Sequence, residues 1–128
     1  MKKFYALGRL KPGERNKTEA AYEQHLELLK RAGEVLWYQF EGIKLRLADN
    51  TFLTVDFSVM NKDCVLEMHD CKPGTIKKMA DGREVLKIFA MDDAKAKMKV
   101  AAEIYPFVFK YAIQKPKKMG GGWQIEEV

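Results

Sequence analysis

The sequence predicts an α/β domain in which a helix, three strands, a second helix and a further strand (α-β-β-β-α-β) form a mixed sheet flanked by helices. Three observations predict it. Residues 16–32 and 92–104 carry helix-start signals and helix-forming side chains. Residues 35–72 alternate apolar runs with turn residues, and residues 107–113 form a later apolar and aromatic run. A length of 128 residues suits one core, so we expect a single domain over residues 1–128.

The N-terminal part predicts a flexible arm followed by a helix. Residues 1–15 are short, basic and rich in turn signals. Asn16 can accept a hydrogen bond from a free backbone N–H, and Glu19 stands three residues later, as a capping box requires. The helix has an apolar stripe and should end before Gly33; the stripe consists of Tyr22, Leu26 and Leu29.

The central part predicts a mostly antiparallel meander from residue 35 to residue 72. Turn residues at 49–50 and 61–63 separate its strands, so residues 51–60 should form one continuous strand. Pro73-Gly74 should break the strand that precedes it. The segment after the break shows no clear pattern except a turn at 80–83.

The C-terminal part predicts a helix and two strands. Residues 92–104 contain good helix formers with acids at the start, and Pro106 should end the helix. Residues 107–113 should add a strand beside the first sheet. Residues 114–122 read as a basic, flexible, Gly-rich loop, and residues 123–128 as a short edge strand.

Bulk composition narrows the class of protein. Lys and Arg exceed Asp and Glu by 23 to 18, a net charge of +5 that is compatible with a nucleic-acid partner without selecting one. The two cysteines, Cys64 and Cys71, are too few for a disulfide scaffold. The start lacks the apolar segment of a signal peptide, and no apolar run approaches the roughly 20 residues that span a bilayer. We therefore expect a cytoplasmic protein with no membrane partner.

The most informative residues are two carboxylates and a lysine in the predicted meander. Asp56 interrupts an apolar run, although Asp is depleted in strand interiors. Asp70 and Lys72 stand two apart, so in a strand they share a face, and Asp56 could lie opposite them on the neighbouring strand. Two carboxylates that hold a hard divalent cation beside a lysine outline a metal-dependent phosphodiesterase site.

Each candidate has a functional and a structural interpretation. Asp56, Asp70 and the Cys71 carbonyl would hold the metal, Glu19 would reach it directly or through a water, and Lys72 would be a positioned cation. In the structural interpretation Glu19 only caps its own helix, Asp56 is exposed on a half-solvated strand, and Lys72 is a surface lysine. Candidate phosphate contacts, each of which could instead be an ordinary solvated side chain, are Lys95, Lys99, Lys115, Lys117 and Lys118.

The α-β-β-β-α-β order with Glu19, Asp56 and Asp70-x-Lys72 resembles the PD-(D/E)XK nuclease superfamily. Residues 16–22, 40–47, 54–57 and 94–107 look like a family of small phage endonucleases that are similar to Holliday-junction resolvases. The resemblance implies a restriction-endonuclease-like core and Mg²⁺-dependent hydrolysis of DNA, with Mn²⁺ able to substitute. It implies that Glu19, Asp56 and Asp70 bind the metal and that Lys72 is catalytic.

The resemblance also implies a partner and a setting. The partner would be branched or duplex DNA, and a resolvase that cuts two strands symmetrically favours a homodimer. A phage-encoded protein of this kind would act in the cytoplasm of the host cell, in recombination or DNA processing.

Two departures from the family pattern leave an alternative open. Val55 stands where the family usually has a proline, directly before the first motif aspartate. That proline performs no chemistry. Asp70-Cys71-Lys72-Pro73-Gly74 stands where close relatives have Glu-Val-Lys-Gly, and residues 73–91 look like an insertion. The alternative is a catalytically inactive nuclease-fold protein that binds nucleic acid or a host protein.

Overall fold

A computed structural model describes residues 13–88 and 92–128 of the chain. Most of the expected N-terminal arm, residues 1–12, therefore lies outside the described residues. The elements are α1 (Lys17–Arg31), β1 (Val35–Phe40), β2 (Lys44–Ala48), β3 (Thr51–Thr54), β4 (Phe57–Asn61), β5 (Leu66–Lys78), β6 (Glu84–Ile88), α2 (Asp92–Ile104), β7 (Val108–Gln114), a 3₁₀ turn η1 (Lys117–Met119) and β8 (Trp123–Glu127).

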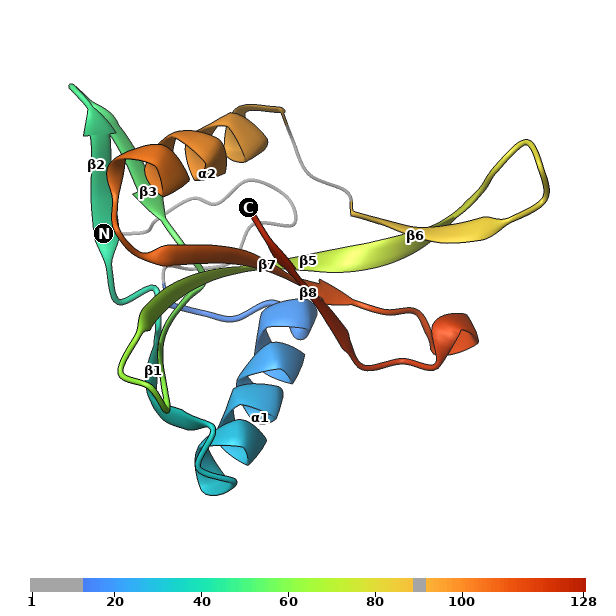
Figure 1. Cartoon of the computed structure of the whole chain (residues 1–128), viewed down its shortest axis with the longest axis horizontal. Helices are drawn as coiled ribbons and strands as arrows, with labels where there is room; N and C mark the ends of the chain where they lie inside the picture. The colour runs from blue at the N-terminus through green and yellow to red at the C-terminus, as the bar shows by residue number, and fades with distance from the viewer. Residues whose placement is uncertain (1–12, 89–91) are drawn as a thin grey trace, which may run out of the picture.

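The main sheet is mixed and lies between the two helices. Its strand order is β1-β4-β5-β7-β8, with β6 paired to β5. The β5–β7 pair is parallel and the other pairs are antiparallel. In Figure 1, α1 lies on one side of this sheet and α2 on the other. The predicted α/β class with a mixed sheet and flanking helices is confirmed.

Both predicted helices are confirmed, and α1 begins as its sequence requires. The Asn16 side chain accepts a hydrogen bond from the Glu19 N–H (2.8 Å), and the Glu19 carboxylate accepts one from the Asn16 N–H (2.9 Å). This reciprocal capping box satisfies two N–H groups that would otherwise lack partners. Gly33 follows the helix with a φ of 84°, a conformation that glycine adopts without steric cost.

The core has one half on each face of the sheet. The half under α1 consists of Tyr22, Leu26, Val35, Phe57, Val59, Cys71 and Ala112. The half under α2 consists of Leu45, Val55, Met68, Met98, Ala101 and Phe109. Alternation along β5 sends Met68 into the second half and Cys71 into the first, as a strand buried on both faces requires.

The predicted meander is wrong in two respects. Residues 51–60 are not one strand, because β3 ends at Thr54 and β4 begins at Phe57. β1 pairs with β4, while β2 and β3 pair only with each other as a separate hairpin. The apolar side chains of this hairpin pack with α2 instead of extending the sheet, and the fully buried Val55 anchors the bend that follows it.

The predicted break at Pro73-Gly74 is also wrong, because β5 continues to Lys78. The strand changes neighbours at this point, since β7 pairs with it as far as Pro73 and β6 pairs with it from Gly74 onward. A proline is tolerated where a strand is not held in a continuous ladder on both edges. β5 and β6 then leave the body of the molecule as a two-stranded ribbon (Figure 1), which is joined by the expected turn near residues 80–83.

The predicted C-terminal strands are confirmed as β7 and β8, and β8 lies at the edge of the sheet. The loop between them contains η1, and the Lys115 N–H donates a hydrogen bond to the Gly122 carbonyl (2.9 Å). None of the helices in the described part of the chain is both long and apolar enough to cross a bilayer.

Candidate functional site

Four predicted site residues meet beside the middle of β5. Glu19 comes from the first turn of α1, Asp56 from the bend between β3 and β4, and Asp70 and Lys72 from β5 itself. The β4–β5 pairing ends at Phe57 and His69. Beyond that pair the backbone ladder stops, and the Asp56 side chain accepts the hydrogen bond from the Cys71 N–H.

Asp56 is the central residue of this group. Its Oδ2 accepts a hydrogen bond from the backbone N–H of Cys71 (2.7 Å), which holds the bend against β5. Burial raises the pKa of Asp56 well above its ordinary value of 3.8, and the negative charge of Asp70 and a hydrogen bond with Glu19 raise it further. Asp56 therefore lies in a bend outside the strands and is half-buried, so the expected position within a strand and the structural interpretation of an exposed strand residue are both wrong.

Glu19 caps its own helix, as the structural interpretation expects, and its part in binding a metal stays a prediction. One carboxylate oxygen accepts the hydrogen bond from the Asn16 N–H. The same side chain also lies near enough to Asp56 to help raise the pKa of that carboxyl. The capping box therefore fixes the orientation of Glu19 as well as the helix end.

Asp70 and Lys72 form an ion pair on the face of β5 opposite Cys71. Lys72 Nζ lies 3.1 Å from Asp70 Oδ2, and the two side chains are 22% and 14% exposed, so solvent can reach both. Burial lowers the pKa of Lys72, but Asp70 and Asp56 outweigh that effect and raise it above its ordinary value. Lys72 is therefore a permanent cation at neutral pH.

Cys71 contributes its backbone while its side chain faces the core. The thiol is buried under α1, and burial raises its pKa, with Asp56 and Asp70 adding to the effect. A thiol in this state is neither a nucleophile nor a metal ligand. The N–H is bound to Asp56, and metal binding by the Cys71 carbonyl stays a prediction.

The donor set suits a hard divalent cation in its chemistry. Among residues 13–88 and 92–128, no group of three or more His, Cys, Asp and Glu side chains is already arranged to hold a metal ion. Each carboxylate has a protein partner instead: Asn16 for Glu19, the Cys71 N–H for Asp56, and Lys72 for Asp70. Carboxylate oxygens are the ligands that Mg²⁺ prefers, and a cation would relieve the repulsion that raises the pKa of Asp56.

Tyr111 is a site residue that the sequence did not reveal. It pairs with Asp70 in the parallel β5–β7 register, so the two side chains share a face. Burial raises the pKa of Tyr111 and the charge of Asp70 adds to the effect, so its hydroxyl stays protonated. Within the apolar run 107–113 only the strand register could have identified it.

The five predicted phosphate-contacting lysines lie apart from the carboxylates. Lys95 and Lys99 are on α2, whereas Lys115, Lys117 and Lys118 are in the β7–β8 connection. Within the described residues none of the five forms an ion pair with Glu19, Asp56 or Asp70, and Lys118 pairs with Glu84 (3.0 Å).

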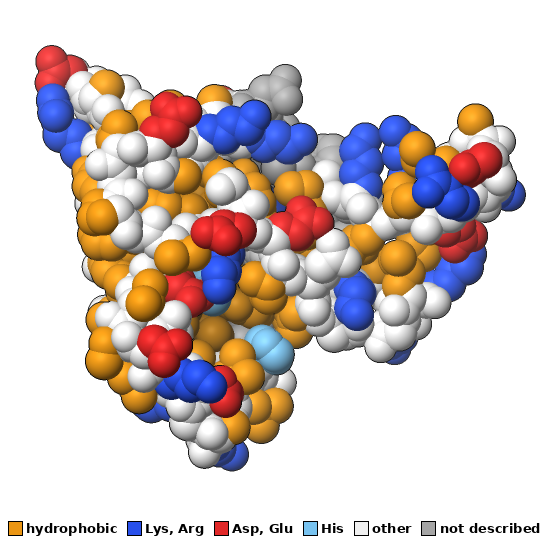
Figure 2. Space-filling model, in the orientation of Figure 1, with side chains coloured by type: hydrophobic (Ala, Val, Ile, Leu, Met, Phe, Trp, Pro, Cys, Tyr) orange, Lys and Arg blue, Asp and Glu red, His pale blue; other side chains and the backbone are white. Residues whose placement is uncertain are grey.

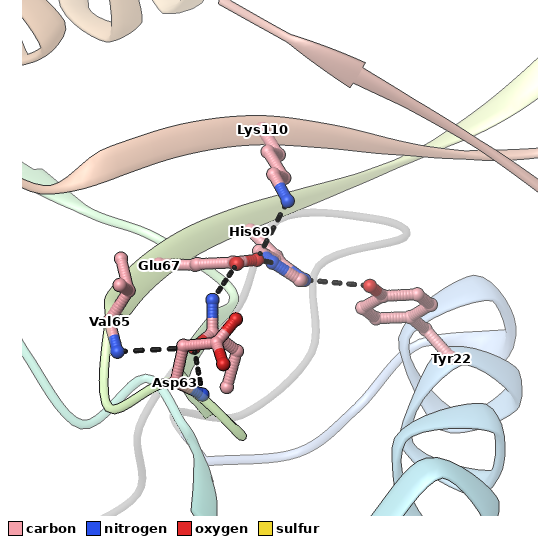
Figure 3. A network of polar contacts seen from close by, with 7 residues as sticks. Tyr22, Asp63, Val65, Glu67, His69 and Lys110 are labelled. Atoms are coloured by element: carbon pink, nitrogen blue, oxygen red, sulfur yellow. Dashed lines mark hydrogen bonds and ion pairs between the residues drawn. The ribbon is translucent and has the colours of Figure 1, made fainter. Parts of the chain in front are cut away.

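A buried polar network lies behind the site, on the α1 face of β5 (Figure 3). Tyr22 Oη and His69 Nδ1 are 2.6 Å apart, and His69 Nε2 lies 2.7 Å from Glu67. Glu67 also contacts Lys110 Nζ (3.0 Å) and accepts a hydrogen bond from the Asn61 side chain (2.8 Å). The network ties α1, β5 and β7 together, so it fixes the strand that carries Asp70 and Lys72.

Glu19 and Lys72 are 53 positions apart in the sequence (72 − 19), and the fold alone brings α1 to β5. Comparisons with models of known protein families, with curated proteins and with solved structures find no match for this chain.

Proposed function

We propose that this chain is a metal-dependent DNA endonuclease that hydrolyses phosphodiester bonds, selects branched DNA such as a Holliday junction, and uses Mg²⁺ or Mn²⁺. The observation that supports it best is the Asp70–Lys72 ion pair on β5, with Asp56 bound to the intervening Cys71 N–H and its pKa raised by burial and by the charge of Asp70. If the β2–β3 hairpin and β6 are taken as insertions, the chain order α1, β1, β4, β5, α2, β7 follows the α-β-β-β-α-β order of the resemblance, which supports the proposal.

The residues divide the chemistry between binding and positioning. A divalent cation held by Asp56 and Asp70 would supply Lewis-acid stabilisation of the charge that develops on the phosphate. Lys72 stays protonated and partly exposed, so it can hold a phosphate oxygen and orient the attacking water. Glu19 keeps Asp56 in place through their hydrogen bond, and the Tyr111 hydroxyl can donate to the substrate.

The proposal extends to the partner and the setting given by the resemblance. Symmetric cleavage of a four-way junction would need two sites, and a homodimer is the simplest way to provide them. The setting would be the cytoplasm, of the host cell for a phage-encoded protein, where the DNA substrate is found.

The test is cleavage of a labelled four-way junction and of a matched linear duplex, with Mg²⁺, with Mn²⁺ and with EDTA. The proteins are the wild type, Asp70→Asn, Lys72→Met and the control Asp63→Asn, which alters an exposed carboxylate on the β4–β5 turn. We expect metal-dependent cleavage of the junction by the wild type and the control. The rates of the two site variants should fall at least about a hundredfold, as the loss of one catalytic group commonly causes.

Equal cleavage of both substrates would retain the endonuclease and remove the preference for branched DNA. Absence of cleavage by the folded protein with every metal would favour the second candidate, an inactive nuclease-fold protein that binds nucleic acid or a host protein. The observation on the side of that candidate is the Asp70–Lys72 ion pair, which occupies a carboxylate that the metal would need.

A further inference from the structure

The positive charge of the chain is concentrated in one part of the molecule. The β5–β6 ribbon from residue 74 to residue 88 and the β7–β8 connection from residue 114 to residue 122 are here called the basic arm. It contains seven cationic residues, Lys77, Lys78, Arg83, Lys87, Lys115, Lys117 and Lys118, and two acidic ones, Asp81 and Glu84. The resulting +5 equals the net charge of the whole chain, so the remainder is neutral overall.

The two parts of the basic arm lie next to each other. Gln114, at the end of β7, pairs with Pro73, and Lys118 contacts Glu84 across the two segments (3.0 Å). Figure 2 shows the arm extending from the body with Lys and Arg side chains spread along it. The arm is therefore one projecting surface assembled from two loops of the chain.

The ribbon turns its basic face to solvent. Thr75 pairs with Lys87 and Lys77 pairs with Val85, so Lys77 and Lys87 share one face of the ribbon, and both are exposed. The opposite face carries the half-buried apolar side chains Ile76, Leu86 and Ile88. Among the described residues, Lys77 and Lys87 have no acidic partner within ion-pair distance, so their charges are available to a ligand.

The basic arm is joined rigidly to the candidate site. Lys72 and Lys77 belong to the same strand, β5, and a strand rises about 3.3 Å per residue, so five residues separate them by roughly 17 Å. Their odd spacing puts the two side chains on opposite faces of the strand, so the ribbon carries its charges on a face other than the one with Asp70 and Lys72. A two-stranded ribbon is also narrow enough to enter the major groove of a duplex.

We propose that the basic arm binds duplex DNA through its backbone phosphates, by a face of β5 other than the one that carries Asp70 and Lys72. This inference rests on the proposed function for the choice of DNA as the ligand, but not for any cleavage. The binding energy would come mainly from phosphate contacts and from counterion release, so the arm would position the duplex without reading its sequence.

The test compares two charge-matched double variants. Lys77→Ala with Lys87→Ala removes the two lysine charges on the basic face of the ribbon, while Lys30→Ala with Lys44→Ala removes two exposed charges from α1 and β2, outside the arm. Binding of a fluorescent duplex is measured in EDTA over a range of salt concentrations. The slope of log K against log salt should become shallower by roughly two for the ribbon variant, and it should not change for the control.

The contacted phosphates are mapped by ethylation interference on the same duplex. Interference should occur in the wild type and disappear in the ribbon variant. Equal salt slopes for the wild type and the ribbon variant would overturn the inference.

The outcomes separate the two proposals. DNA binding that depends on the basic arm, without metal-dependent cleavage, would support the inference about the arm and contradict the proposed endonuclease activity. Cleavage with the same salt slope in the wild type and the ribbon variant would support the endonuclease activity and contradict the inference about the arm. If the wild type binds no DNA, both fail.

Discussion

At the residue scale, the fold brings carboxyl groups close together at the candidate site, which is unfavourable when they are ionised. Asp56 lies against Glu19 and Asp70, and burial with these neighbours raises its pKa. A folded-state pKa above the unfolded value means that this group stabilises the fold only at low pH. Its contribution is present below about pH 4 and is progressively lost as the pH rises from there.

Asp56→Asn should therefore stabilise the metal-free protein while abolishing cleavage. Asparagine is neutral, can still accept from the Cys71 N–H and can donate to Glu19, so it keeps both contacts. At pH 8 we expect a gain of about 1 kcal/mol in the free energy of unfolding, or roughly 3 to 6 °C in the melting temperature. The measurement is a thermal melt in EDTA at pH 8 and at pH 4.

The gain should vanish at pH 4, where the wild-type carboxyl is protonated in the folded state. Asp63→Asn, on the exposed β4–β5 turn, should change neither melt. A loss of stability in Asp56→Asn at pH 8 would show that the ionised carboxylate is favoured in the folded protein.

The sequence identified some residues of the candidate site and missed others, and each outcome has a physical reason. Asp56 and Asp70 were identifiable because a carboxylate within an apolar run is unfavourable without a partner. Tyr111 was missed because an aromatic residue within an apolar strand is ordinary, and only its pairing with Asp70 distinguishes it. His69 is buried, and its partners come from α1 and from its own strand, so they have no local signature in the sequence.

At the element scale, β5 is held from both faces. Its α1 face carries the network around Glu67, and its α2 face carries Asp70 and Lys72. Hydrogen bonds from His69, Asn61 and Lys110 lower the pKa of Glu67 to about 2, with the His69 contact as the largest cause. Because this folded-state pKa lies below the ordinary value of 4.5, the stabilisation is complete above pH 4.5 and is lost as the pH falls towards 2.

Glu67→Gln should lower the free energy of unfolding at neutral pH. It should also weaken the dependence of that free energy on pH below pH 4.5. We expect a loss of about 1 to 3 kcal/mol at pH 7, because a charged partner of a buried network is removed. The difference from the wild type should shrink between pH 4.5 and pH 2.5. Urea unfolding at several pH values measures it, with the exposed Glu103→Gln as the control. If the difference in the free energy of unfolding were the same at all pH values, the ionised form of Glu67 would not be what stabilises the network.

Gly74 is the point at which β5 changes neighbours, and the close packing there depends on the missing side chain. A Cβ at this position would lie 2.5 Å from Leu86 Cδ1 and 2.6 Å from the backbone oxygen of Gln114. Gly74→Ala should therefore cost about 1 to 3 kcal/mol, since a backbone atom cannot move aside easily. Gly42→Ala is the control, because its nearest atoms belong to the flexible Gln39 side chain, and it should cost less than about 0.5 kcal/mol. Equal denaturation midpoints for the two variants would contradict this account of the β5 crossing.

Element prediction succeeded where the local signal and the tertiary environment agree. The capping box of α1 and the Pro106 stop of α2 are local, and the structure reproduces both helices. The strand at residues 51–60 failed because the bend at Asp56 depends on a hydrogen bond to Cys71, fifteen positions away. The strand break predicted at Pro73 and Gly74 is wrong because β5 changes its pairing partner there, from β7 to β6. Pro73 therefore does not interrupt a continuous backbone ladder.

At the scale of the whole molecule, the sequence predicted the class but not the strand order. The meander assumed that successive strands are neighbours in space, which is the commonest arrangement. The β2–β3 hairpin departs from it, because its apolar side chains complete the core under α2. The net charge of +5 was visible in the sequence, but its concentration in one arm required the pairing of β5 with β6 and the Lys118–Glu84 contact.

The exposed edge at β8 limits how two copies of the chain can associate. An open strand edge is a template for a strand from another molecule, and charged side chains are a common means of blocking it. Glu126 and Glu127 are consecutive and exposed, so they point to opposite faces and present a carboxylate on each. A second β8 would bring two more carboxylates to the same border, and mutual repulsion would oppose a continuous intermolecular sheet. Any two-fold assembly that cuts both strands of a junction would have to form through another surface.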